Sequence, residues 1–425
     1  MKVSLIRSMT VLAGASLLIS ACGATPTAAP TSAPAATAAP AATTAPAATT
    51  APAAGGAFKV GMVLVGPYND KGWNQATYEG LEYVKSKMPG FSFEYVDKVN
   101  SADRPNTKGT QVADDLIAKG ANMIIFNSDD FKDDALETAK KHPNIPVIHV
   151  SGDYAWKDGK NFKEQKNLIN IMGQMEYMKM LAGCSAALGT QTGKIGFLGP
   201  LINEETRRLA ASAYLGAKYC WTNVLKKDPK ALEFKVTWIG FWFNIPGVTL
   251  DPTKVADDFY NGGFDVVMSG IDTPEAATEA KKMQSAGKKD YYVHYDYKQG
   301  CDIAPDACLG SPYFNWGPAF LDAVKKAQAG TLTESFSWNP PDWKNINNPD
   351  TSAVGFLPGK ALGDKAASVD ALAKGLADGS INLYKGPLNY QDGSVFLKDG
   401  QTATPQQIWY LPQLLQGMEG ASSAK

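Results

Sequence analysis

The chain has 425 residues, which exceeds the roughly 250–300 residues at which one hydrophobic core usually splits into domains. Hydrophobic residues make up 44% of it and charged residues 20%, a globular composition that excludes wholesale disorder. The formal net charge of −1 argues against a nucleic-acid-binding protein, whose signature is a strongly basic patch. His142, His149 and His294 form no HExxH pattern, so we expect no metal site.

The N-terminus has the layout of an export signal. Lys2 and Arg7 precede an apolar stretch, Met9 to Ile19, that is too short for a membrane-spanning helix of roughly 20 residues. The sequence Ile-Ser-Ala-Cys that follows resembles the lipobox of bacterial lipoproteins. This resemblance implies that residues 1–21 are a signal peptide and that Cys22 carries lipid. The alternative is an ordinary signal peptide with an incidental cysteine.

Residues 22–56 form the next segment, which is almost wholly Ala, Pro and Thr with repeats of the type APAATT. It contains no charged and no aromatic residue and cannot bury a core. We predict a disordered linker that holds a folded body away from a membrane surface.

The remaining cysteines are even in number, which in an exported protein permits disulfide bonds. Cys301 and Cys308 flank a short loop that contains a proline, and we expect them to pair. Cys184 and Cys220 lie on successive predicted helices. They either pair or remain buried as small core residues, and the sequence leaves both open.

From Phe58 onward, predicted strands and helices alternate, which is typical of parallel sheets covered by helices. The first run has strands at Phe58–Val65, Phe91–Val99, Asn122–Phe126 and Pro146–Val150, with helices at Trp73–Met88, Thr107–Lys119 and Asp134–Lys141. The second run has strands at Asn167–Met172, Lys194–Leu198, Phe234–Phe243, Phe264–Ser269 and Tyr291–Tyr295. Its helices are Met175–Leu188, Asn203–Tyr219, Thr253–Tyr260 and Pro274–Ala286, and two more follow at Pro318–Ala329 and Asp364–Ala377. A hairpin turn is predicted within Leu388–Leu397.

These two runs predict an α/β fold with two doubly wound parallel-sheet lobes joined by a hinge. We expect the N-terminal lobe at 57–165, with part of about 297–335. The C-terminal lobe is expected at 166–296, with part of about 336–425.

No enzyme motif follows the predicted strands: GxGxxG after the first strand, a Walker A sequence and a GxSxG elbow are all absent. The strand ends instead carry aromatic, amide and acidic residues, and ligands of open α/β sheets bind beyond the carboxyl ends of strands. Such a cleft would stack a flat ring and hydrogen-bond its edges. The candidate ligand-binding residues are Tyr68, Asp70, Trp73, Asn74, Asn127, Trp242, Phe243, Asp272, Asp296 and Trp316.

Several of these residues also have a purely structural interpretation. Asp70 is suited to cap the helix that begins near Trp73, and Asp272 precedes a Thr-Pro that looks like a helix start. Trp242 is as compatible with packing between lobes as with ligand stacking. Trp238, in the middle of a predicted strand, is expected in the core.

Several segments resemble the basic membrane protein family of purine nucleoside receptor A-like substrate-binding lipoproteins. They are GPYNDKGWNQATYEGLEYV, VTWIGFWFN, MSGIDTPEA, NWGPAFLDAVKKAQAGTL and GPLNYQDGSVFLKDG. The resemblance implies a type I periplasmic-binding-protein fold that binds a purine nucleoside or base, adenine-like in this branch, between its lobes. The chain departs from the family at Asn244, where Asp is common, and in an insertion at Ile245–Leu250.

The resemblance also implies roles for matched residues. Trp73 and Trp242 would stack on the ligand, and Asp70 and Asp272 would accept its hydrogen bonds. Trp316 would close the cleft or support the hinge. Tyr68 and Asn74 match or adjoin the first-turn positions.

The function implied is that of a non-enzymatic receptor of an ABC importer, without a cofactor. It would be anchored by lipid to the cell membrane, on the extracytoplasmic side. Its partners would be a purine ligand and the permease and ATPase subunits, and we expect a monomer. The alternatives are a receptor of the same fold that feeds a signalling partner, and a binding protein for another small polar ligand.

Overall fold

Two parallel sheets organise the part of the chain that the computed structural model describes, residues 57–423. The predicted signal peptide, Cys22 and the linker lie outside the described residues. The first sheet is wholly parallel, in the order β11 (Ser335–Asn339), β5 (Leu168–Gly173), β4 (Val147–Val150), β3 (Met123–Phe126), β1 (Phe58–Val63) and β2 (Phe91–Val96). The second has the order β12 (Val354–Pro358), β10 (Cys308–Phe314), β9 (Tyr291–Val293), β8 (Val266–Ser269), β6 (Lys194–Gly199), β7 (Glu233–Trp238) and β15 (Met418–Glu419). Only β12 runs antiparallel to its neighbour in that sheet.

The central strands are continuous apolar runs because helices cover both faces of each sheet. Strands β3 and β8 are buried at every position. The helices of the first lobe are α1 (Trp73–Lys87), α2 (Gly109–Ala118), α3 (Lys132–Lys141) and α8 (Gly317–Gln328). Those of the second lobe are α4 (Met175–Gly189), α5 (Glu204–Tyr219), α6 (Pro252–Asn261), α7 (Glu275–Ser285) and α9 (Ala366–Asp378).

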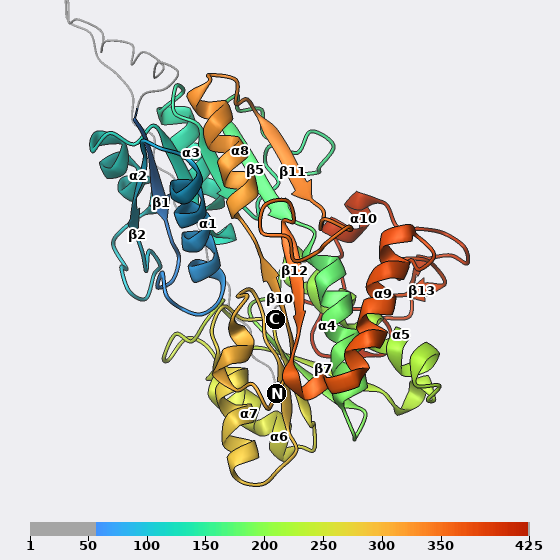
Figure 1. Ribbon diagram of the computed structural model, residues 1–425. Helices are drawn as coiled ribbons and strands as arrows, with labels where there is room; N and C mark the ends of the chain where they lie inside the picture. Colours follow the sequence, from blue (N-terminus) through green and yellow to red (C-terminus); the bar gives the residue numbers. More distant parts are fainter. Residues whose placement is uncertain (1–56, 424–425) are drawn as a thin grey trace, which may run out of the picture. The chain divides into compact units, whose positions relative to one another are not determined.

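The chain passes between the lobes three times: from β5 to α4, from β10 to α8, and from β11 to β12. As a result α8 packs beside α1 and β11 beside β5, although these segments are far apart in sequence (Figure 1). These three crossovers form the hinge. The doubly wound α/β fold expected from the sequence is confirmed.

The lobe boundary differs from the predicted one. Strand β5 pairs with β4 in the first sheet, so this sheet extends to Gly173 and not to residue 165. Strand β10 lies in the second sheet, although it falls within the segment expected in the N-terminal lobe. The strand alternation alone did not reveal which sheet β5 joins, because both sheets are parallel and buried.

Strand β7 is shorter than predicted. It ends at Trp238, and Gly240 then adopts a φ of 105°, a left-handed conformation that ends the strand. Trp238 is therefore half-buried at the strand end and not in the core, and its indole donates a hydrogen bond to the Ala421 carbonyl oxygen, 2.8 Å away. Trp242 consequently lies in a loop.

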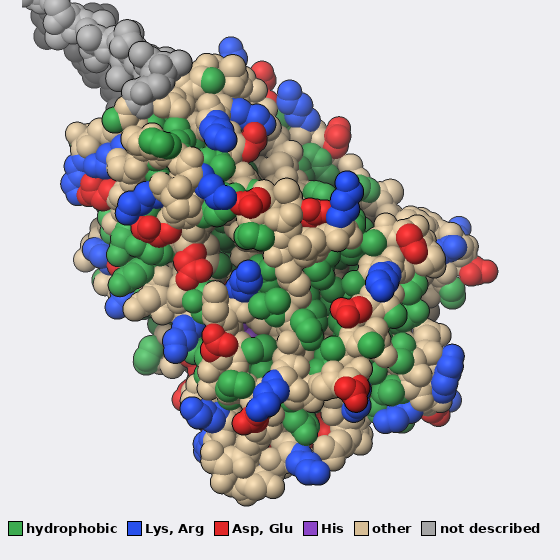
Figure 2. Space-filling model, viewed as in Figure 1, with side chains coloured by type: hydrophobic (Ala, Val, Ile, Leu, Met, Phe, Trp, Pro, Cys, Tyr) green, Lys and Arg blue, Asp and Glu red, His purple; other side chains and the backbone are tan. Residues whose placement is uncertain are grey.

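The last part of the chain packs against the second lobe. The predicted hairpin is present as β13 (Leu388–Asn389) and β14 (Val395–Leu397), and a short helix, α10 (Pro405–Trp409), follows. Within residues 57–423, no helix has the length and apolar character needed to cross a membrane. On the face shown in Figure 2, basic and acidic side chains are interspersed and form no single-sign patch.

Candidate functional site

A cavity lies between the lobes, beyond the carboxyl ends of β3, β4, β6, β7, β8 and β9. Its empty volume is about 460 Å³, including the part open to solvent. The first lobe contributes Trp73, Ser128, Asp129 and Ser151. The second lobe contributes Lys179, Phe197, Pro200, Glu205, Thr206, Leu209, Trp242, Gly270, Asp272, Tyr295 and Asp296. The wall therefore combines aromatic rings with buried ionisable groups.

Trp73, the first residue of α1, is held in a fixed orientation. Its indole Nε1 donates to the Asn127 carbonyl oxygen at 2.5 Å. Its ring meets those of Phe314 and Trp316 edge-on, with centroids 5.1 and 5.4 Å away. Trp73 thus presents a preorganised aromatic surface to the cavity.

Asp70 braces the turn before α1. Its carboxylate accepts hydrogen bonds from the backbone N–H groups of Gly72, Asn74 and Gln75 at 2.9–3.0 Å, and from the Asn74 side chain at 2.7 Å. Burial raises its pKa to about 6, although these hydrogen bonds favour the charged form. The capping interpretation of Asp70 is confirmed, and its side chain does not line the cavity.

Asn74 and Asn127 extend this brace. Asn74 Oδ1 accepts from the Gly66 N–H at 3.0 Å and from Asn127 Nδ2 at 2.8 Å. Asn127 Oδ1 accepts from the Val65 N–H at 3.0 Å. Both side chains hold the ends of β1 and β3 together and lie behind the cavity wall.

Two further predicted residues also lie outside the cavity wall. Tyr68 is 37% exposed, and its ring contacts those of Tyr78 and Tyr95. Trp316 stacks on Phe314, with centroids 4.7 Å apart, and supports Trp73 from behind. Trp316 is thus placed to position a cavity residue.

The loop after β7 packs against the first lobe. Its residues Trp242, Phe243 and Ile245 belong to the hydrophobic cluster built around Val63 and Val65 of the first lobe. Trp242 lines the cavity and is 9% exposed, so packing and contact with the cavity coexist in this side chain. Phe243 only packs, against Gly66 and Phe241. In the insertion at Ile245–Leu250, Ile245 is buried whereas Val248 and Leu250 are exposed.

Asp272 and Asp296 supply buried carboxyl groups to the wall. Neither carboxylate oxygen of Asp296 has a hydrogen-bond partner among the described residues. Burial raises the pKa of both groups well above the usual range, and the repulsion between them adds to the pKa of Asp272. The backbone N–H of Asp272 donates to the Trp242 carbonyl oxygen at 3.0 Å, which ties these two predicted site residues together.

Lys179, Glu205 and Tyr295 were not predicted as site residues. Lys179 Nζ donates to the Ser269 carbonyl oxygen at 2.9 Å and lies 3.2 Å from the centroid of the Tyr295 ring. Burial lowers the pKa of Lys179 to about 7, against the attraction of Asp296. Burial raises the pKa of Glu205 to about 7. For Lys179 the available signal was a charged residue within the largely apolar helix α4. Glu205 lies among charged residues in the first turn of α5, which gave no such signal.

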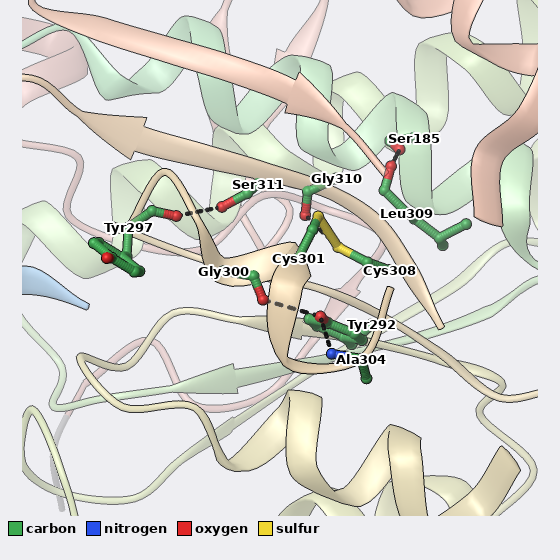
Figure 3. Close-up of a disulfide and its surroundings, with 10 residues drawn as sticks. All are labelled: Ser185, Tyr292, Tyr297, Gly300, Cys301, Ala304, Cys308, Leu309, Gly310 and Ser311. Carbon is green, nitrogen blue, oxygen red and sulfur yellow. Dashed lines mark hydrogen bonds between the residues drawn. A yellow bond between two sulfur atoms is a disulfide. The ribbon is translucent and has the colours of Figure 1, made fainter. Parts of the chain in front are cut away.

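Two disulfide bonds lie in second-lobe segments that carry or follow residues of the cavity wall. Cys301–Cys308 closes the loop after Asp296, and the Tyr292 hydroxyl inside this loop donates to the Gly300 carbonyl oxygen at 3.0 Å (Figure 3). Cys184–Cys220 joins α4 to the π-helical turn after α5. The elements that carry Lys179 and Asp296 are thus covalently braced.

The lobes touch around the cavity. A Cβ atom at Gly72 would collide with the Asp272 carbonyl oxygen. The His294 ring lies 2.9 Å from the Lys71 carbonyl oxygen, and Gln75 Nε2 donates to the Tyr297 hydroxyl at 2.8 Å. The first turn therefore meets the second lobe directly at the cleft.

The cavity wall offers aromatic surfaces and several hydrogen-bond acceptors. The aromatic surfaces are those of Trp73 and of Trp242, whose loop follows β7 but packs on the first lobe, and Glu205, Asp272 and Asp296 offer acceptors. Among residues 57–423, no three or more His, Cys, Asp or Glu side chains cluster in a way that would hold a metal ion.

Comparison with known proteins places this geometry in context. The sequence model of a family described as ABC transporter substrate-binding protein, PnrA-like, matches residues 57–339. A purine-binding protein of Brucella abortus is 25% identical over 361 residues, which are 82% of this chain and 89% of that protein. Basic membrane protein D of Borreliella burgdorferi is 23% identical over 259 residues, 59% of this chain and 66% of that protein. A solved ABC transporter solute-binding protein of Aeropyrum pernix has the same fold, with a TM-score of 0.60 and 14% identity over 76% of this chain and 92% of its own.

Proposed function

The chain belongs to the Bmp family of PnrA-like ABC transporter substrate-binding proteins, and from this we propose that it captures a purine base or nucleoside between its lobes. The observation that carries the proposal is the presence of Trp73 and Trp242 on the wall of one cavity that also holds buried carboxyl groups. The Brucella abortus relative named as purine-binding supports the same ligand class.

Aromatic stacking supplies the affinity for the base. A base stacked on an aromatic side chain contributes ~1–3 kcal/mol, and any purine offers a suitable face. The Trp73 ring is already locked by its hydrogen bond to Asn127 and by its aromatic neighbours, so binding costs little ordering of this side chain.

The carboxyl groups favour ligands that carry hydrogen-bond donors. Asp272, Asp296 and Glu205 accept hydrogen bonds from an exocyclic amine or from ribose hydroxyls when they are ionised. With Asp129 they outnumber Lys179, the one basic residue among the lining residues. The wall offers a phosphate group only Lys179, whose positive charge is weakened because burial lowers its pKa to about 7, so the preferred ligand is a base or nucleoside and not a nucleotide.

The proposed receptor delivers its ligand to a permease and an ATPase, on the extracytoplasmic side of the membrane. It acts without chemistry on the ligand, and Cys22 anchors it through lipid. A signalling receptor with the same cleft is the alternative, and a neighbouring histidine kinase gene in place of permease genes would favour it.

A thermal-shift screen tests this function. Adenine, adenosine, guanosine and inosine are compared with AMP as the phosphate-bearing control, and with sugars and branched-chain amino acids. A ligand that binds only the folded state stabilises it by ~2.7 kcal/mol at a hundredfold excess over Kd. We expect a shift with at least one purine and none with AMP. A shift with a sugar or amino acid and with no purine would reject the ligand class, and release of free base would indicate an enzyme.

A further inference from the structure

The loop between β7 and α6, residues 239–251, is attached at both ends to the second lobe. The backbone N–H of Gly240 donates to the Pro200 carbonyl oxygen, directly after β6, at 3.1 Å. The backbone N–H of Leu250 donates to the Ile239 carbonyl oxygen at 2.9 Å, which closes the loop where it leaves and rejoins the lobe. The base of the loop therefore moves with the second lobe.

The middle of this loop is buried in the other lobe. Phe243 and Ile245 are 8% and 6% exposed. With Trp242 they join a hydrophobic cluster whose other buried members all lie within residues 63–168 of the first lobe. A Cβ atom added at Gly66, which follows β1, would lie 3.3 Å from Phe243 Cε1, so the Phe243 ring packs directly over the backbone there. The loop thus begins and ends in the second lobe and buries its tip in the first.

The tip of the loop is braced by its own hydrogen bonds. The Ile245 carbonyl oxygen accepts from the backbone N–H groups of Val248 and Thr249, both at 3.0 Å. The Thr249 hydroxyl oxygen accepts from the Ile245 N–H at 2.9 Å. Val248 belongs to the same turn but is 75% exposed, so it lies on the side that faces away from the cluster. A compact loop of this kind loses little conformational freedom when its apolar side packs against another surface.

Separation of the lobes would expose this apolar contact to water. Because the base of the loop follows the second lobe, opening the cleft withdraws Phe243 and Ile245 from the first-lobe cluster. Burial of apolar surface is favourable in proportion to its area, and it requires no ligand. The contact therefore stabilises the closed arrangement of the lobes both before and after a ligand binds.

We propose that residues 239–251 form a strap that keeps the ligand-free receptor mainly closed, with Phe243 and Ile245 as its anchors in the first lobe. A ligand enters and leaves only while the strap is detached, so the population of the open form limits both rates. Because Trp242 lies on the strap, the docked tip also fixes this ring on the cavity wall. The strap rests on the fold and on these contacts, and it acts on any ligand class in the cleft.

Small-angle scattering of the dialysed, ligand-free protein tests the strap without reference to any ligand. Ile245→Ser places a hydroxyl group in the apolar cluster and should detach the tip, so the radius of gyration should rise above that of the parent. Val248→Ser, in the same turn but on its exposed side, is the matched control and should leave the radius of gyration unchanged. Melting temperatures show that each variant is folded, and Ile245→Ala replaces Ile245→Ser if the serine prevents folding. A folded variant as compact as the parent would overturn the proposal.

Stopped-flow kinetics then separates a strap from a simple support of the binding site. The probe is whichever of adenine, adenosine, guanosine and inosine binds. In Ile245→Ser the association and dissociation rate constants should both rise, by up to about tenfold, because the open form becomes more populated. A rise in the dissociation rate constant alone would mean that Ile245 only supports ligand contacts, and would overturn the strap. If no purine binds, the proposed ligand class fails, whereas the scattering result still decides whether the strap exists.

Discussion

The indole of Trp242 has two roles that a pair of measurements separates. It lines the cavity and also packs in the first lobe's hydrophobic cluster. We expect Trp242→Ala to remove a stack of roughly 1–3 kcal/mol, which weakens purine affinity ~5–150-fold. Trp242→Phe should lose less because an aromatic face remains. Calorimetric Kd and melting temperature are measured on the same proteins.

Trp238 provides the matched control. It is a half-buried tryptophan on the same segment, and it does not line the cavity. Trp238→Ala should lower the melting temperature and leave Kd unchanged. If Trp242→Ala behaves in this same way, its role is packing alone and the stacking assignment passes to Trp73.

Asp70 is expected to act on stability and not through ligand contact. Its carboxylate satisfies three backbone N–H groups and the Asn74 side chain in a buried turn. Asp70→Ala leaves these donors unpaired, so the free energy of unfolding should fall by ~1–3 kcal/mol in urea denaturation. Asp115→Ala, at an exposed helix position, serves as control. An Asp70→Ala protein as stable as the parent would show that water replaces the carboxylate.

Among individual residues, the sequence predicted the cavity-lining residues that follow strands better than those that lie within helices. Trp73, Trp242, Asp272 and Asp296 line the cavity, because the carboxyl ends of parallel strands meet at one edge. Asp70, Asn74 and Asn127 lie close in sequence to residues that line the cavity. Their side chains, however, form hydrogen bonds that hold the turn itself together. Lys179 and Glu205 were missed because their helices are buried on nearly every side, which hides the face that borders the cavity.

At the scale of elements, the turn before α1 approaches the second lobe so closely that only glycine fits at position 72. A Cβ there would overlap the Asp272 carbonyl oxygen of the other lobe. Gly72→Ala should therefore hold the lobes apart and weaken purine affinity about tenfold or more, since each ~1.4 kcal/mol lost is tenfold. Small-angle scattering with ligand should show a less compact protein than the parent. Gly262→Ala, at the exposed end of α6, is the control. Unchanged affinity in Gly72→Ala would mean that binding does not require this contact.

The element pattern was predictable where hydrophobic periodicity was strong, and less so at the hinge. Helices α1 and α5 lie within a residue or so of their predicted bounds. Strand β5 was predicted in the C-terminal lobe but pairs with β4 in the first sheet, because the sequence of a strand does not reveal which sheet it joins. The end of β7 depended on the left-handed Gly240, which shortened the strand and moved Trp242 into a loop.

At the scale of the whole molecule, the buried acids of the cleft make stability depend on pH. Burial raises the pKa of Glu205 from 4.5 to about 7, despite the attraction of Arg208, and Asp129 and Glu176 add to the rise. The folded protein therefore holds this proton more tightly than the unfolded chain does. Its contribution to stability is fully present below pH 4.5 and is lost as the pH rises through about 7.

Glu205→Gln removes this titration. The stability of the parent relative to Glu205→Gln should fall between about pH 4.5 and pH 7 by on the order of 3 kcal/mol, and then stay level. Urea unfolding of the ligand-free proteins at several pH values measures the difference. A difference that does not change with pH would show that Glu205 is hydrated in the folded state.

The proposed membrane attachment depends on Cys22. Cys22→Ala should release the protein from membranes, because a lipid anchor contributes ~0.8 kcal/mol per buried CH₂ and residues 57–423 include no helix able to span the bilayer. Fractionation after a salt wash measures this. Continued sedimentation of the Cys22→Ala protein with membranes would contradict the lipid anchor.

The most direct test of the proposed function is calorimetric titration of the purified protein with purines, followed by chromatography of the ligand. We predict that at least one of adenine, adenosine, guanosine and inosine binds at one site per chain and is recovered unchanged, whereas AMP does not bind. Saturable binding of a sugar or an amino acid, with no heat from any of the purines, would contradict the account.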